Sequence, residues 1–400
     1  MKKKWLLGLG ALCTAFATVG FIGCGDGGNG DGADDGDGAG AQGSLEYALS
    51  EDGAYYTLRS IGTYEGTEIV IPSDYQGKPV KKVGAHAFNN ADITSVVVGD
   101  KVESIGNDAF HDCYDLTSIV IGKSVTEIGV RAFMNCEELT GIDVAEDNTA
   151  YKDIDGNLYT KDGKTMIKYA TGKTATEYVS PEGLETVMEE TFTGSDNLTS
   201  VQIVCDTLGK SAFSHCVNLA SVEIDCERIG ENAFSGCGKL ASVKLSKAVT
   251  NIGKYAFYEC YTITDVYYNG AIEDWCNITF GNSDANPKKH TANLYFYNGT
   301  EYELLGDTLI IPDTVTEIKA EAFYGCAIKN IVLGANVSSI GSGAFRSSEV
   351  KNVYFKGEAS KELKDMFYSQ TKFFYYSETP NYDGYHWYYQ GDVPTIWLND

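Results

Sequence analysis

The cysteines are the residues of this chain whose number most invites a chemical interpretation. Eleven are present, with five histidines, and clusters of these residue types hold metals or act as nucleophiles. No C-x-x-C pair occurs, and six of the cysteines belong to a series whose adjacent members lie 21 to 23 residues apart wherever it is unbroken. That spacing does not fit a zinc module. The sequence therefore predicts no metal site and no cofactor.

Catalytic signatures are also missing from the sequence. There is no H-E-x-x-H, no G-x-S-x-G, no Walker A motif and no dinucleotide-binding fingerprint. Ser214, His215 and Cys216 are adjacent, but the members of a catalytic triad are normally brought together by the fold. We therefore predict that the protein is not an enzyme.

An internal repeat explains where most cysteines lie. Its anchor is a phenylalanine, with Val, Ile or Leu five residues earlier and Val, Leu or Cys eight residues earlier. The anchors are Phe88, Phe110, Phe133, Phe192, Phe213, Phe234, Phe257, Phe323 and Phe345. Six cysteines fall three residues after an anchor, Cys205 and Cys226 fall eight before one, and Cys276 lies outside the pattern. The repeat cysteines are predicted to be small buried residues, and whether any pair as disulfides is left open.

The repeating unit is too short to bury its own apolar residues. Copies must therefore stack, which predicts a β-rich solenoid of units of about 22–23 residues with short parallel strands. We expect Phe133 and Phe234 to be buried, each between the phenylalanines of the neighbouring coils. Phe192 is expected to pack more loosely, because Met188 and Thr191 replace the usual Gly and Ala of its coil.

The consensus L-x-x-I-x-I followed by V-x-x-I-G-x-x-A-F-x-x-C resembles the BspA-like leucine-rich repeat family of bacterial surface proteins. It is clearest at 116–136 and 240–260, and the resemblance covers roughly residues 45–360. The resemblance implies a right-handed leucine-rich repeat coil. It also implies host matrix proteins or other cells as partners, while ligands vary among proteins that share one scaffold.

Several segments depart from the repeat. Residues 45–79 are predicted to be an N-terminal cap, and 146–180 and 261–308 are insertions that either bind a ligand or are irregular repeats. The first insertion reads as a hairpin around Asp162-Gly163. In the second, Ile272, Trp275 and Ile278 could line a short helix. The aromatic segment within 361–400 is predicted to cap the solenoid; the alternative is a platform that stacks on sugars.

The N-terminus carries a targeting signal. Lys2, Lys3 and Lys4 precede an almost wholly apolar run that ends in Phe21-Ile22-Gly23-Cys24. This pattern is similar to a lipobox, which predicts a signal peptide at 1–23 and lipidation of Cys24. An ordinary cleavable signal or a retained helix is the alternative. The Gly- and Asp-rich residues 24–44 are a predicted flexible linker, so the protein is expected at the extracellular face of the bacterial membrane.

The net charge excludes one class of partner. Removal of residues 1–23 takes away three of the 31 Lys and Arg and none of the 56 Asp and Glu, which leaves 28 against 56 and a formal charge of −28. Such a surface repels phosphate backbones, so we expect no nucleic-acid binding.

The candidate binding residues are aromatic. The third solvent-facing column of the predicted sheet contains Tyr267 and Tyr354, and the C-terminal segment contains Tyr385 and Trp387. We predict a lipid-anchored, non-catalytic module for adhesion or protein recognition. The alternative is a glycan-binding lipoprotein that uses the aromatic C-terminal segment.

Overall fold

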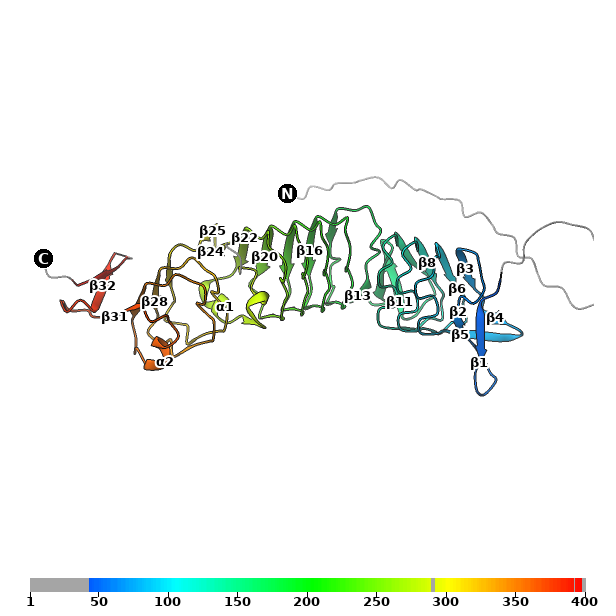
Figure 1. The fold of residues 1–400 in the computed structure, drawn as a ribbon, viewed down its shortest axis with the longest axis horizontal. Coiled ribbons are helices and arrows are strands. Elements are labelled where there is room, and N and C mark those ends of the chain that lie inside the picture. Colours follow the sequence, from blue (N-terminus) through cyan, green and yellow to red (C-terminus); the bar gives the residue numbers. More distant parts are fainter. Residues whose placement is uncertain (1–42, 289–291, 392, 398–400) are drawn as a thin grey trace, which may run out of the picture. The chain divides into compact units, whose positions relative to one another are not determined.

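The computed structural model describes residues 43–288, 292–391 and 393–397. Cys24 and the predicted signal and linker lie outside these residues. The described chain is built almost entirely from strands, which form successive coils (Figure 1). Its helices are α1 (Ile272–Cys276), α2 (Lys361–Lys364) and the 3-10 helix η1 (Ser283–Ala285).

Each regular coil contributes one strand of four or five residues to a set that we call the long-strand sheets. Their strands pair mainly in parallel, and the closing pairs β24–β25 and β32–β33 are antiparallel. The strands are β3 (Glu68–Ile71), β6 (Ser95–Val98), β8 (Ser118–Ile121) and β10 (Gly141–Val144); β14 (Glu177–Val179), β16 (Ser200–Val204), β18 (Ser221–Asp225), β20 (Ser242–Ser246), β22 (Asp265–Asn269), β24 (Asn293–Tyr297) and β25 (Tyr302–Leu304); and β26 (Thr308–Ile310), β28 (Asn330–Leu333), β30 (Asn352–Phe355), β31 (Lys372–Tyr376), β32 (His386–Gln390) and β33 (Val393–Ile396).

A second, mostly two-residue strand of each coil builds the other side of the solenoid. These strands are β5 (Lys78–Val83), β7 (Ser104–Ile105), β9 (Glu127–Ile128), β13 (Thr165–Lys168), β15 (Thr186–Val187), β17 (Thr207–Leu208), β19 (Arg228–Ile229), β21 (Asn251–Ile252), β23 (Thr279–Phe280), β27 (Glu317–Ile318) and β29 (Ser339–Ile340). Antiparallel neighbours extend this side: β1 (Glu46–Leu49) with β2 (Tyr56–Ser60), β4 (Asp74–Tyr75) with β5, and β11 (Tyr151–Ile154) with β12 (Asn157–Thr160).

The strand register follows the sequence repeat. Ser200 of β16 lies opposite Ser221 of β18, which lies opposite Ser242 of β20, so equivalent residues of successive coils form straight rows. Figure 1 shows β16, β20 and β22 side by side in this arrangement. The parallel stacking and the coil spacing confirm the predicted solenoid.

The anchor phenylalanines stack on one another inside the coils. Ring centroids of consecutive anchors lie 5.3 Å apart for Phe213 and Phe234 and 5.4 Å apart for Phe234 and Phe257, which confirms the expectation for Phe234. Phe133 is buried and stacks on Phe110 at 5.7 Å. On its other side the chain enters the first insertion, so the expectation of a second phenylalanine neighbour is wrong.

Phe192 packs more tightly than its sequence predicts. It is fully buried and lies 4.3 Å from Phe213, 4.8 Å from Tyr169 and 4.8 Å from Tyr178, centroid to centroid. The insertion supplies these two tyrosines, and the Thr191 hydroxyl donates to the Met188 carbonyl at 2.8 Å. The expectation of a loose coil is therefore wrong, because residues outside the repeat fill the space.

The cysteines after the anchors form a ladder of hydrogen bonds. In five coils the thiol donates to the carbonyl of the phenylalanine one coil earlier, each at 3.1 Å: Cys113 to Phe88, Cys136 to Phe110, Cys216 to Phe192, Cys237 to Phe213 and Cys260 to Phe234. All nine described cysteines are buried and free. The sulfurs of Cys205 and Cys226 approach to 2.7 Å. The predicted structural role of the repeat cysteines agrees with this packing.

Each regular coil turns the chain with two left-handed residues, one two positions before the anchor and one two positions after it. Around Phe213 these are Ser211 at φ 53° and His215 at φ 58°, and around Phe234 they are Asn232 at 56° and Gly236 at 76°. The left-handed region is unfavourable for most side chains. The close packing of the turns therefore holds many non-glycine residues in a conformation that they would otherwise avoid.

Both insertions continue the solenoid. The first contains the predicted hairpin, β12 and β13, and β13 then pairs in parallel with β15. In the second, Ile272 and Trp275 lie on α1, and Ile278 follows the helix. Trp275 is fully buried and its indole donates to the Ala322 carbonyl at 2.7 Å. The side chain thus links the second insertion to the coil that follows it.

Candidate functional site

The outer face of the long-strand sheet from β14 to β24 carries a continuous row of solvent-facing side chains. Strand register aligns Val179, Gln202, Glu223, Lys244, Tyr267 and Tyr295. We call these six residues the outer row. Their strand neighbours, such as Val222 and Val243, point inward and are buried. This alternation leaves one face of the sheet free of covering structure.

Small side chains hollow the surface beside the outer row. Ser200, Ser221 and Ser242 form the adjacent row, and a depression of about 300 Å³ lies over them. Lys244 and Glu223 border the depression and pair at 2.8 Å. The hydrogen bond to this carboxylate raises the pKa of Lys244. Both side chains stay partly exposed, so the pair contributes little to stability and remains available to a ligand.

Tyrosines gather where the outer row reaches the second insertion. Tyr267 stacks on Tyr295 with centroids 4.7 Å apart, and Tyr302 meets Tyr267 edge-on at 5.3 Å. Tyr297 lies 5.3 Å from Tyr302 and is 37% exposed. With Tyr267 these residues form what we call the tyrosine cluster: Tyr267, Tyr295, Tyr297 and Tyr302. Sequence reasoning found only Tyr267, because the second insertion puts Tyr295 28 residues later, outside the usual spacing.

Asp265 fixes the position of the cluster. Its carboxylate accepts hydrogen bonds from Asn293 Nδ2 at 3.1 Å and from the Tyr295 hydroxyl at 3.2 Å. The hydrogen bond from Asn293 is the largest effect that lowers the pKa of Asp265. The negative charge is thereby held next to the aromatic rings. The cluster offers apolar ring surface, hydroxyl groups and one carboxylate within a small area.

Tyr354 and Trp387 do not lie at the surface that the sequence predicted. Tyr354 is 7% exposed, stacks on Phe374 at 5.0 Å and meets Trp387 edge-on at 5.4 Å. Trp387 is fully buried, and its indole donates to the Phe355 carbonyl at 3.3 Å. The C-terminal strands β32 and β33 bring Trp387 against this part of the sheet. The two residues therefore pack the C-terminal end and present no ring to a ligand.

Tyr385 is the exposed member of the C-terminal pair. It is 62% exposed, and its backbone N–H donates to Asp383 Oδ1 at 2.8 Å. Trp397 stacks on Tyr388 at 3.9 Å and meets Tyr382 edge-on. The structure does not bring Tyr385 together with Tyr267, because Tyr267 lies on β22 and Tyr385 directly precedes β32, which belongs to a different sheet. The predicted site residues thus fall into one surface cluster, one buried cluster and one isolated tyrosine.

The repeat identifies the family. The family description "BspA type Leucine rich repeat region" matches residues 67–161, 168–286 and 296–388, with six copies. The chain belongs to the BspA-type leucine-rich repeat family. The family match confirms the resemblance that the A-F-x-x-C consensus of the repeat indicated.

Solved structures similar to this BspA-type protein include several bacterial repeat proteins. A leucine rich cell surface protein from Faecalibacterium prausnitzii is 21% identical, with 61% of this chain and 98% of that chain covered and a TM-score of 0.35. A leucine-rich repeat protein from Eubacterium ventriosum is 18% identical, with 77% and 93% covered and a TM-score of 0.40. The pneumococcal vaccine antigen PcpA is 18% identical, with 84% and 79% covered and a TM-score of 0.38. A comparison with curated proteins finds no match.

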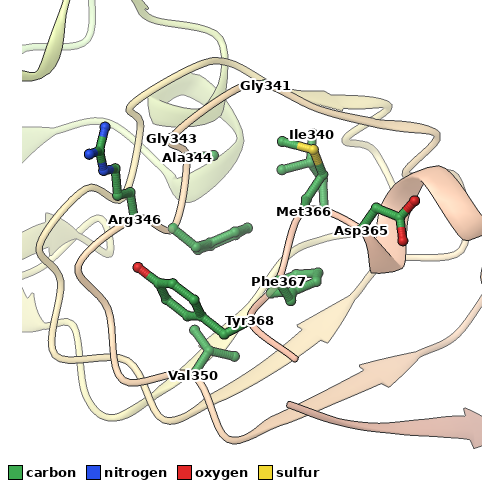
Figure 2. A pocket seen from close by; sticks show the side chains of 11 residues that line it. Ile340, Gly341, Gly343, Ala344, Arg346, Val350, Asp365, Met366, Phe367 and Tyr368 are labelled. Carbon is green, nitrogen blue, oxygen red and sulfur yellow. The ribbon is translucent and has the colours of Figure 1, made fainter. Parts of the chain in front are cut away.

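A cleft of about 300 Å³ lies beside the last stacked anchor of this BspA-type solenoid. Phe367 stacks there on Phe345 at 5.4 Å. Figure 2 shows Arg346 and Asp365 at opposite sides of the cleft, with Tyr368 between them and Val350 below. Arg346, Asp365 and Tyr368 are all exposed. The cleft therefore has no buried polar group that requires a ligand.

Two further kinds of site are absent from the described part of the chain. No group of three His, Cys, Asp or Glu side chains converges there as metal ligands would. No helix among the same residues is long and apolar enough to cross a membrane.

Proposed function

We propose that this protein is a bacterial cell-surface module, anchored by lipid on Cys24, which recognises an extracellular protein through the outer face of its solenoid and performs no catalysis. The family resemblance supports the surface location and the choice of a protein partner. The lipobox-like residues Phe21 to Cys24 support the anchor. Matrix proteins of a host or proteins of other cells are the expected ligands.

The observation that carries the proposal is the uncovered outer row with the tyrosine cluster at its end. Tyrosine is enriched among the residues that contribute most to protein–protein binding, because it combines a large apolar ring with a hydroxyl group. The neighbouring Lys244–Glu223 pair and Asp265 supply charges for orienting a partner. The flat, extended face fits a protein surface better than a small molecule.

Binding by the mature chain tests the proposal. The protein is applied to immobilised extracellular-matrix proteins and, in parallel, to a glycan array. The double variant Tyr267→Ser/Tyr302→Ser is compared with Tyr258→Ser, which changes an exposed tyrosine on an anchor turn. We expect binding to a matrix protein that weakens about thirtyfold or more in the double variant, equivalent to losing one hot-spot interaction of about 2 kcal/mol, and is unchanged in the control.

Two results would contradict the proposal. One is matrix-protein binding that is equally strong in the double variant and in the wild type. The other is glycan binding that survives the double variant and is lost in Tyr382→Ser/Tyr385→Ser, which would favour the aromatic C-terminal segment.

A further inference from the structure

A second cavity lies where the first insertion interrupts the phenylalanine stack. Its volume is about 260 Å³, and it is lined by the anchor turn around Phe133, by the insertion hairpin and by the turn before Phe192. Much of its wall is apolar, including Met134, Tyr151, Ile167 and Met188. Methionine side chains adapt to the shape of what they contact. The cavity is therefore largely apolar, and it lies beside Phe133, which among the described residues has a stacked aromatic neighbour on one side only.

Two groups of opposite charge line this cavity without a partner. Lys168, at the end of β13, is only 6% exposed, and burial lowers the pKa of its ammonium group. Among the described residues, none forms a hydrogen bond or ion pair with that ammonium. Glu190 Oε2 is buried and has no hydrogen-bond partner. Buried polar groups are nearly always paired, so the Glu190 oxygen needs an explanation.

The charges around the cavity act on the two groups through space and not through a direct contact, since Glu190 interacts electrostatically with both Arg131 and Lys168. Arg131 is held by Asp108 through hydrogen bonds of 2.9 and 3.2 Å. Glu189 is exposed at the rim. No ion pair within 4.0 Å joins Lys168 to Glu190, although both lie in the described part of the chain. The Lys168 ammonium and the Glu190 carboxylate thus belong to residues that line one cavity, and they form no ion pair with each other.

We infer that this cavity binds a small zwitterion with an apolar side chain, namely an apolar α-amino acid. Its carboxylate accepts from the Lys168 ammonium and its ammonium donates to Glu190 Oε2. Its side chain lies against Met134, Met188 and Tyr151. A simple anion would satisfy Lys168 and leave the Glu190 oxygen unpaired, and a simple cation would do the reverse. A volume near 260 Å³ is slightly smaller than that of most pockets for drug-sized ligands, and it suits a molecule as small as an amino acid.

Calorimetric titration of the mature protein with L-leucine tests the inference. Two analogues each lack one charge: 4-methylpentanoate has no ammonium group and L-leucinamide has no carboxylate. We expect saturable binding of L-leucine and binding of either analogue that is about tenfold weaker or more, because one buried partner stays unpaired. Glycine should also bind more weakly, because it lacks the apolar side chain.

Variants assign the binding to the two residues. Lys168→Met and Glu190→Gln keep the side-chain volume and should each weaken L-leucine binding about tenfold or more. Lys288→Met is the matched control, since Lys288 is also buried but lies near Cys326. The affinity of Lys288→Met for L-leucine should equal that of the wild type. If Lys168→Met does not fold, Glu190→Gln and the analogues still decide.

The inference is overturned by any of three results. These are no saturable L-leucine binding up to about 10 mM, equal affinity for L-leucine and 4-methylpentanoate, or unchanged affinity in Glu190→Gln. Matrix-protein binding through the outer row is measured separately, so the failure of one proposal leaves the other standing.

Discussion

Removal of single rings from the phenylalanine stack should have graded effects on stability that follow the number of ring contacts. Replacing a buried phenylalanine with alanine costs about 3–5 kcal/mol, and each aromatic pair contributes about 0.5–1.5 kcal/mol beyond burial. Phe234 has two stacked neighbours, Phe192 has three aromatic neighbours and Phe133 has one. We expect the cost of the alanine variants to rise in the order Phe133, Phe234, Phe192, by about 1 kcal/mol at each step.

The structure gives a second reason for the low cost at Phe133. Its free side adjoins the 260 Å³ cavity, so fewer contacts are lost there when the ring is removed. Phe133→Ala should cost about 2–3 kcal/mol, and Phe192→Ala about 4–5 kcal/mol. Because coils contact mainly their neighbours, each change should act locally along the solenoid.

Native-state hydrogen exchange measures these costs coil by coil, which a single unfolding curve of a repeat protein does not. Phe234→Ala should cost about 3–4 kcal/mol and so lower the protection of amides in β18, β20 and β22 by about a hundredfold to a thousandfold. Amides of β6 and β8 should keep their protection and serve as the internal control. If Phe133→Ala loses as much protection as Phe192→Ala, ring contacts do not set the cost and the reasoning is refuted.

Four further outcomes are expected. Cys24→Ala should abolish incorporation of a fatty-acid analogue in growing cells, and equal labelling of the variant and the wild type would exclude lipidation at this residue. Cys237→Ala should destabilise its coil by about 1–2 kcal/mol through a small cavity and a lost hydrogen bond, and elemental analysis of the wild type should find no stoichiometric zinc. Ser211→Gly should stabilise the protein by about 0.5 kcal/mol in urea unfolding, because it relieves a left-handed residue, whereas Ser221→Gly in β18 should destabilise it. Burial raises the pKa of Cys136, Cys276 and Cys326 to about 12. Because these thiols lose their protons near pH 9 in the unfolded chain, the free energy of unfolding should fall as the pH rises from about 9 to about 12. Equal stability at about pH 8 and about pH 10.5 in urea unfolding would contradict this.

The stacking of the coils could be predicted because the repeat itself encodes it. Every anchor phenylalanine has apolar residues five and eight positions before it. If one anchor is buried, the equivalent residues of the other coils are therefore expected to be buried as well. Phe367 and Tyr169 continue the stack but were not predicted. Phe367 lies 22 residues after Phe345, yet the other columns of the repeat are absent around it.

Contacts that depend on how the irregular segments fold could not be predicted. Tyr354 occupies a position that faces solvent in regular coils, and it is buried because Phe374 of β31 and Trp387 of β32 pack against it. The contact between Tyr354 and Trp387 joins residues 33 positions apart, which no local period describes. In the same way, Lys168 and Glu190 have no special spacing in sequence. Both residues line the same cavity only because the insertion hairpin stands in place of a regular coil.

The left-handed positions were also hidden from the sequence. Arg131, Tyr255 and Glu259 adopt positive φ, although their side chains disfavour it. The residues that favour this region mark only some of the positions, such as Gly194 after one anchor, Gly343 before another and Asn232 before a third. Backbone hydrogen bonds between turns, such as Phe213 N to Ala233 O at 2.7 Å, hold the conformation whatever the side chain is.

The thiol ladder has a consequence for how such a chain can change in length during evolution. In the regular coils that follow Phe192, the thiols of Cys216, Cys237 and Cys260 each donate backwards to the phenylalanine carbonyl one coil earlier, namely that of Phe192, Phe213 and Phe234. A duplicated unit therefore brings its own donor and its own acceptor. Gain or loss of one whole unit between Phe192 and Cys260 would leave every thiol in this ladder with a partner. Recombination within the regular coils can thus lengthen or shorten the recognition face while each buried thiol keeps its hydrogen bond to a carbonyl.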